Sequence, residues 1–265
     1  MTPFRLGLCA AIALALTSAS VLATAAPQPA PKPAPATAAP APTVEPAAVQ
    51  ALERMRAYLG TLTTFEIRAE TSLDLVMYDG QLVTLDGANR YTVRRPNAFA
   101  VEVATPWKVR QLVYDGKSLT LVAPELGYYA TVEAPPTIRQ TLDAAYDRYG
   151  LMVPLQDLFR WADPANRAER EPLSEAMVVG PSKVGGVEAD HYAFREGPID
   201  WQIWIQKGEH PVPLKLVILD RGNADRPQFE ARLSWNLAPQ MTAETFTYRP
   251  EKGAMPIKLS TLNSK

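Results

Sequence analysis

The feature that most constrains the fold is a regular alternation of apolar and polar residues in long segments of the chain. From Phe65 to Met77 the odd positions are mostly apolar, and most even positions carry charged or polar side chains. Residues 228–237 alternate in the same way, with Phe229 and Trp235 on the apolar side. Side chains of a strand point alternately to its two faces. Both segments are therefore predicted to be strands that bury one face, as in an antiparallel sheet.

Short turns connect the predicted strands, and Asp79-Gly80 and Asp115-Gly116 are typical of tight hairpins. The strands form two groups. The first group comprises residues 65–77, 81–93, 99–103, 107–114, 118–123 and 128–132. The second group comprises residues 176–179, 186–195, 199–206, 214–220, 228–237 and 244–248. Each group is predicted to be an antiparallel meander.

Three segments have helical spacing instead. Residues 46–59 begin with Pro46, which suits a first helical turn, and are followed by Gly60. Residues 138–149 and 154–161 lie between the two meanders. We expect an α+β fold: a large curved antiparallel sheet of about 11 strands with the helices on its concave face.

The N-terminus has the pattern of a secretory signal peptide. Arg5 precedes an apolar run over residues 6–22, and Ala23-Thr24-Ala25 offers a small-residue cleavage site. We predict a signal peptide over residues 1–25, a Pro/Ala-rich disordered tether over 26–47 and one β-rich domain over 48–260. The mature chain is then periplasmic, with no membrane span after cleavage.

The only cysteine, Cys9, precedes most of the apolar run, whereas a lipidated cysteine would follow it. We therefore expect no lipidation at Cys9. Cleavage near Ala25 would also remove it, which excludes disulfides, thiol nucleophiles and thiolate metal sites from the mature chain.

Charge and motifs exclude several functional classes. The chain has 27 basic and 28 acidic residues, so no charge excess attracts nucleic acid. His191 and His210 have no partner at metal-binding spacing, so we expect no metal site. The sequence has no nucleophile elbow, phosphate loop, dinucleotide fingerprint or zinc-protease motif. We expect neither an enzyme nor a cofactor.

Five short segments are distinctive: residues 91–96 (YTVRRP), 114–117 (YDGK), 126–132 (LGYYATV), 158–161 (LFRW) and 200–205 (DWQIWI). These segments resemble a family of predicted periplasmic proteins of unknown function, which is assigned to the LolA/LolB/LppX-like superfamily of periplasmic lipoprotein carriers. The resemblance spans essentially the whole predicted domain. It implies an open half-barrel with a helical lid over an apolar cavity, which receives lipoprotein acyl chains in the best-known relatives.

Candidate ligand-binding residues lie on the apolar faces of the strands and lid helices. They are Phe65, Ile67, Leu73, Leu75, Phe99, Val101, Ile138, Leu142, Tyr146, Leu155, Leu158 and Phe159. Periodicity reports burial, so the same residues would equally fill an ordinary core.

Three further residues are candidates for the binding site or its rim. Trp204 lies on the polar face of its strand, where it would line a binding mouth or be covered by a loop. Arg94 and Arg95 end a strand and form a candidate polar rim for a lipid phosphate or a partner carboxylate. The alternative for both arginines is solvation or a salt bridge within the fold.

The sequence thus favours a non-catalytic periplasmic protein that binds or carries a lipid, an acyl chain or another lipophilic molecule. The alternative is an interaction or stress-sensor module with an envelope protein as its partner, in which the tether and the Trp204 face matter more than the cavity. An unrecognised hydrolase is the third hypothesis, although no catalytic group can be named for it.

Overall fold

The computed structural model describes residues 43–161 and 172–262. The predicted signal peptide and residues 26–42 of the predicted tether lie outside the described residues. The last tether residues take part in the fold: the amide of Glu45 donates to the carbonyl of Ala176, and Pro46 begins the first helix.

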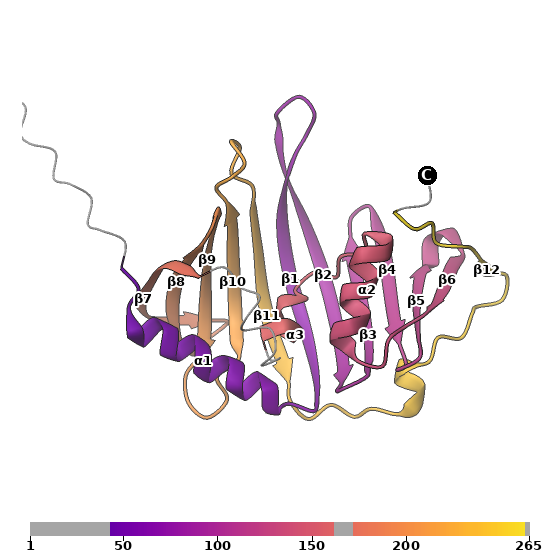
Figure 1. The fold of residues 1–265 in the computed structure, drawn as a ribbon, viewed down its shortest axis with the longest axis horizontal. Coiled ribbons are helices and arrows are strands. Elements are labelled where there is room, and N and C mark those ends of the chain that lie inside the picture. The colour runs from indigo at the N-terminus through magenta and orange to yellow at the C-terminus, as the bar shows by residue number, and fades with distance from the viewer. Residues whose placement is uncertain (1–42, 162–171, 263–265) are drawn as a thin grey trace, which may run out of the picture. The chain divides into compact units, whose positions relative to one another are not determined.

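Twelve described strands form one sheet in the order β12-β6-β5-β4-β3-β2-β1-β11-β10-β9-β8-β7 (Figure 1). The first meander comprises β1 (Thr64–Val76), β2 (Leu82–Arg94), β3 (Ala98–Thr105), β4 (Lys108–Tyr114), β5 (Ser118–Ala123) and β6 (Tyr128–Glu133). The second comprises β7 (Leu173–Val184), β8 (Val187–Glu196), β9 (Ile199–Gln206), β10 (Pro213–Asp220) and β11 (Gln228–Asn236), and the short β12 (Met255–Pro256) follows it. Neighbouring strands are antiparallel except β12 and β6, and the edge strands β12 and β7 do not pair with each other. The structure confirms the predicted open antiparallel sheet.

The two meanders join through the two segments whose alternation is clearest. Strand β1 pairs with β11 so that Ile67 lies opposite Trp235 and Ala69 lies opposite Leu233. This register places the apolar positions of both strands on one face. The helices lie against that face, which we call the helix-covered face.

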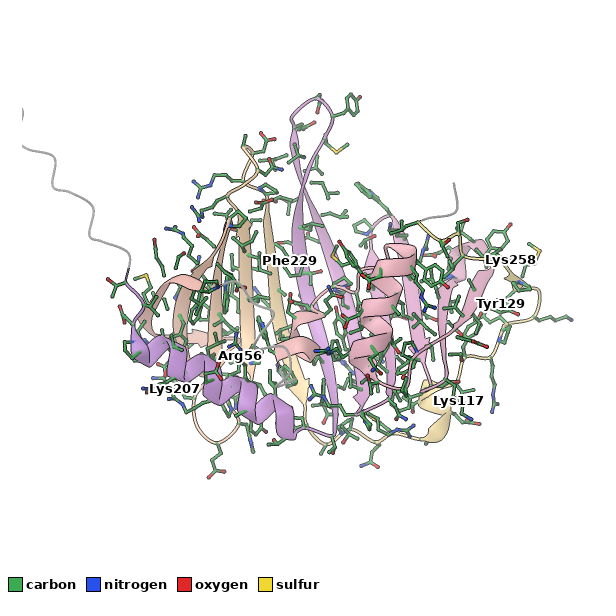
Figure 2. The ribbon with its side chains drawn as sticks, viewed as in Figure 1. Arg56, Lys117, Tyr129, Lys207, Phe229 and Lys258 are labelled. Carbon is green, nitrogen blue, oxygen red and sulfur yellow. The ribbon has the colours of Figure 1, made fainter. Side chains whose placement is uncertain are left out.

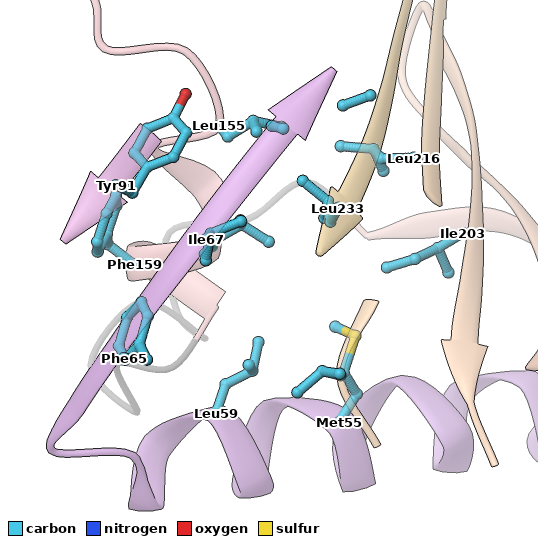
Figure 3. Packing of buried hydrophobic residues seen from close by; sticks show 14 of the residues in the cluster. Met55, Leu59, Phe65, Ile67, Tyr91, Leu155, Phe159, Ile203, Leu216 and Leu233 are labelled. Carbon is cyan, nitrogen blue, oxygen red and sulfur yellow. The ribbon is translucent and has the colours of Figure 1, made fainter. Parts of the chain in front are cut away.

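The first helix, α1 (Pro46–Thr61), crosses the second meander. It buries Leu52, Met55 and Leu59 against a cluster that includes Ile203 and Leu216 (Figure 3). The helix continues through Gly60 to Thr61, two residues beyond the predicted end at residue 59.

The second helix, α2 (Ile138–Tyr149), lies over the first meander (Figure 1). The Thr137 side chain accepts from the amide of Gln140 at its start, and Gly150 ends it with a left-handed conformation at φ 65°. The Tyr114 hydroxyl, rising from the sheet, donates to the carbonyl of Pro135 at 2.5 Å and fixes the segment before the helix. The short α3 (Asp157–Trp161) lies between α1 and α2 (Figure 1) and starts later than the predicted 154.

One predicted strand is wrong. Residues 244–248 do not form a strand; the 3₁₀ helix η3 (Ala243–Phe246) stands in their place. The amide of Thr242 donates to the Thr245 hydroxyl at 3.1 Å, and Phe246 is buried under the Arg94 guanidinium, 4.7 Å from the ring centroid. Local capping and a single aromatic anchor decide the conformation here, and neither produces an alternation. The short parallel β12 was likewise not predicted.

The predicted strand over residues 176–179 is the central part of the longer β7. The pairing of β7 with β8 changes register between Val178 and Gly180. This irregularity lets the strand continue past Gly180 and Pro181, which would otherwise end it.

Since consecutive strands are antiparallel, their turns alternate between the two edges of the sheet. The upper edge, at the top of Figure 1, is the edge that carries the β1–β2, β3–β4, β5–β6, β8–β9 and β10–β11 turns. The lower edge has the β2–β3, β4–β5, β7–β8 and β9–β10 turns.

Candidate ligand-binding surface

The lower part of the helix-covered face is closed by the helices. Nine of the candidate residues are buried in one hydrophobic cluster: Phe65, Ile67, Phe99, Val101, Ile138, Leu142, Leu155, Leu158 and Phe159. The ring of Phe159 on α3 lies 6.4 Å from those of Phe65 and Tyr91, measured between centroids. These residues form a packed core in this structure.

Above the helices the same face remains apolar but is only partly covered. On β1, Ile67 is 0% exposed whereas Leu73, three rungs of the same face further up, is 40% exposed. We call this region the open strip. It consists of Leu73, Leu75, Val83, Leu85, Ile218 and Phe229.

The register holds the open strip together across four neighbouring strands. Leu73 lies opposite both Leu85 on β2 and Phe229 on β11, and Phe229 lies opposite Ile218 on β10. Leu75 lies opposite Val83 one rung higher. Figure 2 shows Phe229 on the part of β11 above α1 and α3. All of these residues except Leu73 are partly buried.

A row of small residues lies directly below the open strip. Thr71 lies opposite Gly87 on one side and Ala231 on the other. A Cβ on Gly87 would come within 2.8 Å of the Thr71 hydroxyl and 3.0 Å of the Ala104 carbonyl, so only glycine fits this position without a shift. The row therefore provides little side-chain bulk between the core and the open strip.

Below the small row, Asn89 supplies a buried polar atom without a partner. Its side chain is 6% exposed, and its Oδ1 has no hydrogen-bond partner among the described residues. Its neighbour on this face, Tyr91, donates its hydroxyl to the carbonyl of Pro154 at 3.0 Å. Burial raises the pKa of the Tyr91 phenol, and a hydrogen bond with Asn89 opposes that rise. An unpaired buried acceptor costs about 1–3 kcal/mol, so Asn89 would gain from a donor delivered by a ligand or water.

Tyr146 lies on α2 and is exposed, unlike the other candidate helix residues. It follows Leu142 on the helix but faces solvent near the upper end, where α2 approaches Gly150. The structure therefore brings Leu73 and Leu75 together in the open strip and places Tyr146 outside the packed core.

Trp204 lies on the opposite face of the sheet from the helices. Its ring stacks on that of His191 at 3.8 Å with an interplanar angle of 8°, and the Lys215 ammonium lies 4.9 Å from its centroid. Arg94 and Arg95 lie at the lower edge, over the rings of Phe246 and Phe65 respectively. None of the three reaches the open strip.

Both histidines have partners of their own. His191 Nε2 is 2.9 Å from the Gln202 amide oxygen, and His210 Nδ1 is 2.9 Å from the Tyr58 hydroxyl on α1. Burial, with a further contribution from Lys215, lowers the pKa of His191 although the contact with Gln202 acts against it. Within residues 43–161 and 172–262, no group of three His, Cys, Asp or Glu side chains could hold a metal ion.

Sequence reasoning missed Val83, Leu85, Ile218, Phe229 and Asn89 as candidates. The signal for the first four was available, because each continues the apolar alternation of its own strand. What the pattern could not supply is the pairing that brings them beside Leu73. Asn89 breaks the apolar pattern of its strand, which makes it visible as an exception.

No helix in the described part of the chain is long and apolar enough to cross a membrane. No curated protein matches the sequence.

Solved structures with a similar arrangement have low sequence identity to this chain. An uncharacterised conserved protein from Thermus thermophilus has 13% identity over 80% of this chain and 99% of its own, with a TM-score of 0.45. LprF from Mycobacterium bovis has 12% identity over 76% and 97%, with a TM-score of 0.43. A LolA superfamily protein from Nitrosomonas europaea has 9% identity over 76% and 97%, with a TM-score of 0.37.

A family model described as "Predicted periplasmic protein (DUF2092)" matches residues 48–260. The match covers most of the chain. It confirms both the family that the short sequence segments suggested and the periplasmic location. The chain therefore belongs to the DUF2092 family of predicted periplasmic proteins.

Proposed function

We propose that this protein is a non-catalytic periplasmic carrier that binds the hydrocarbon part of a lipophilic molecule, such as a lipid acyl chain, on the open strip. The observation that carries the proposal is the exposure of Leu73, on the face that is fully buried at Ile67. A sheet face that stays apolar beyond its helical cover leaves hydrocarbon in water. Burying that surface under a ligand would contribute about 25 cal/mol per Å².

The surroundings of the open strip support an elongated apolar ligand with a polar end. The apolar residues of the open strip extend across four strands, from β2 to β10. The strip is therefore wide enough to contact an elongated hydrocarbon chain. The small row and the unpaired Oδ1 of Asn89 lie at its lower end. A hydroxyl, amide or ammonium group of the ligand would find its acceptor there.

Titration of the full chain, purified after export, with a dansyl-labelled fatty acid tests the proposal. We expect saturable binding with an increase in dansyl emission. Leu73→Glu places a charge in the open strip and should weaken binding at least about tenfold, which corresponds to 1.4 kcal/mol. The matched control is Val179→Glu, since Val179 is similarly exposed but lies on the edge strand β7.

Native mass spectrometry and lipid extraction of the same preparation give an independent readout. A stoichiometric lipid adduct supports a carrier and identifies its ligand class. No uptake of the fatty acid together with a bare protein mass would refute the proposal, as would equal weakening by the two variants when both keep the unfolding temperature of the parent.

A further inference from the structure

The upper edge carries large apolar side chains at the tips of its turns. Tyr78, at the tip of the β1–β2 hairpin, is 100% exposed, and Trp107, in the β3–β4 turn, is 63% exposed. Leu82, at the start of β2, and Leu126, before β6, are also exposed at this edge. Exposed apolar side chains also lie on the edge strand β7 and near the C-terminus, but Tyr78 and Trp107 are large aromatic residues in the turns of one edge.

The β1–β2 hairpin extends beyond the other turns of this edge (Figure 1). Its last two rungs are apolar on both faces: Leu75 lies opposite Val83, and Val76 lies opposite Leu82. None of the described helices covers either face there. A flat partner protein would bury one face of such a hairpin, whereas a fluid apolar medium would surround both.

The turns at this edge are ordered by local hydrogen bonds. Gly80 has φ 83° and donates its amide to the carbonyl of Met77 at 2.9 Å, and the amide of Gln81 donates to Asp79 at 3.1 Å. In the β3–β4 turn, the amides of Trp107 and Lys108 both donate to the Thr105 hydroxyl. The aromatic side chains therefore project from fixed turns, and the hairpin backbone is paired internally, as shallow entry into lipid requires.

We propose that the upper edge docks on the surface of a lipid bilayer, with Tyr78 and Trp107 in the headgroup region. Tyrosine and tryptophan combine an apolar ring with one polar group and are enriched at that level of membranes. This inference does not depend on a ligand in the open strip. If the proposed function also holds, a lipid would pass from the bilayer to Leu75 and Leu73 along the helix-covered face of the same hairpin.

The charges at the upper edge indicate which lipids docking requires. The charged residues between the strands at the upper edge nearly balance, with Arg221 and Arg226 against Asp79, Glu125 and Asp225. Docking should therefore depend on apolar insertion and need no anionic lipid.

Flotation of the full exported chain with vesicles tests docking. One vesicle population is phosphatidylcholine alone, and the other contains equal parts of phosphatidylcholine and phosphatidylglycerol. We expect similar binding to both, with little dependence on salt. Tyr78→Ser and Trp107→Ser should each reduce the partition coefficient about tenfold, by the hydrophobic contribution of an exposed aromatic side chain. Val178→Ser and Val187→Ser, which replace exposed apolar residues away from this edge, should change little.

Absence of binding to either vesicle population would overturn the proposal, as would binding that needs phosphatidylglycerol and disappears in high salt. Equal binding by the parent and the Tyr78→Ser/Trp107→Ser double variant would overturn it as well. Leu73→Glu separates the two proposals: this variant should lose fatty-acid binding yet still float with vesicles. The double variant should lose flotation and keep fatty-acid binding.

Discussion

At the lower edge of the sheet the turns are polar and tied to the rest of the fold. Arg95 lies over the Phe65 ring, the Tyr58 hydroxyl meets His210, and Asp115 accepts from the amides of Lys117 and Ser118. At the upper edge, Tyr78 and Trp107 project from their turns into solvent. In the second meander the upper turns are tied as well, because Asp200 pairs with both Arg195 and Arg221. Unpartnered apolar surface is therefore a feature of the turns that carry Tyr78 and Trp107.

The helix-covered face shows the same contrast. Its lower rows, such as those of Ile67 and Phe99, are sealed by helices, and its upper rows, such as that of Leu73, are not. Apolar residues retained in water contribute nothing to folding by burial. The comparison indicates that the lower half of the sheet contributes more to stability than the upper half, where apolar side chains remain in contact with water.

The largest expected effect contrasts two positions on one face of β1. Ile67→Ala should lower the free energy of unfolding by about 3 kcal/mol, because it leaves a cavity in the packed core. Leu73→Ala should lower it by less than about 1 kcal/mol, since much of that side chain is already in water. Urea unfolding of both variants measures the difference. Equal costs would mean that the two halves of the face are equally packed.

A second contrast compares a buried with an exposed tyrosine. Tyr91→Phe removes the hydrogen bond to the Pro154 carbonyl and should cost about 1 kcal/mol. The link that leads into α3 should then exchange its amide hydrogens faster. Tyr78→Phe, at the upper edge, should change neither quantity. If Tyr78→Phe destabilised the protein as much as Tyr91→Phe, the upper turns would have partners within the fold.

The smallest expected effect concerns His191, which lies on the sheet face opposite the helices. Burial lowers the pKa of His191 below its ordinary value of 6.5, so the unfolded chain binds a proton more readily than the folded one. The contribution of His191 to stability is therefore complete above pH 6.5 and decreases as the pH falls from there toward the lowered pKa.

Urea unfolding between pH 7 and pH 5 checks this prediction. His191→Gln keeps a polar group beside Gln202 and should make the pH dependence of unfolding shallower, while Tyr58→Phe, beside His210, serves as the comparison. An unchanged slope in His191→Gln would contradict the assignment.

Much of the fold followed from residue patterns. The alternation in residues 65–77 and 228–237 corresponds to β1 and β11, and the helical spacing of residues 138–149 corresponds to α2. Prediction failed at residues 244–248, where the capping around Thr242 and the burial of Phe246 produce a 3₁₀ helix. The contact of Phe246 with Arg94 joins residues far apart in the chain, and no local pattern encodes it.

The candidate surface was only partly accessible from sequence. Leu73 and Leu75 were candidates because they continue the apolar face of β1, but so did Phe65 and Ile67, which the structure buries. Trp204 was a candidate because it is an aromatic residue on a polar face. In the structure its ring stacks on His191 and lies 4.9 Å from the Lys215 ammonium, so that face provides its partners.

By itself, the sequence determined which residues form strands and which side chains share a face, because the periods of strand and helix are local properties of the chain. Tertiary structure alone decided where the helices end over the sheet, and hence that Ile67 is sealed while Leu73 is open. It also decided that Tyr78 and Trp107 share one edge. These outcomes depend on pairing and packing between segments far apart in the chain, and a periodic pattern records burial without recording the neighbour that provides it.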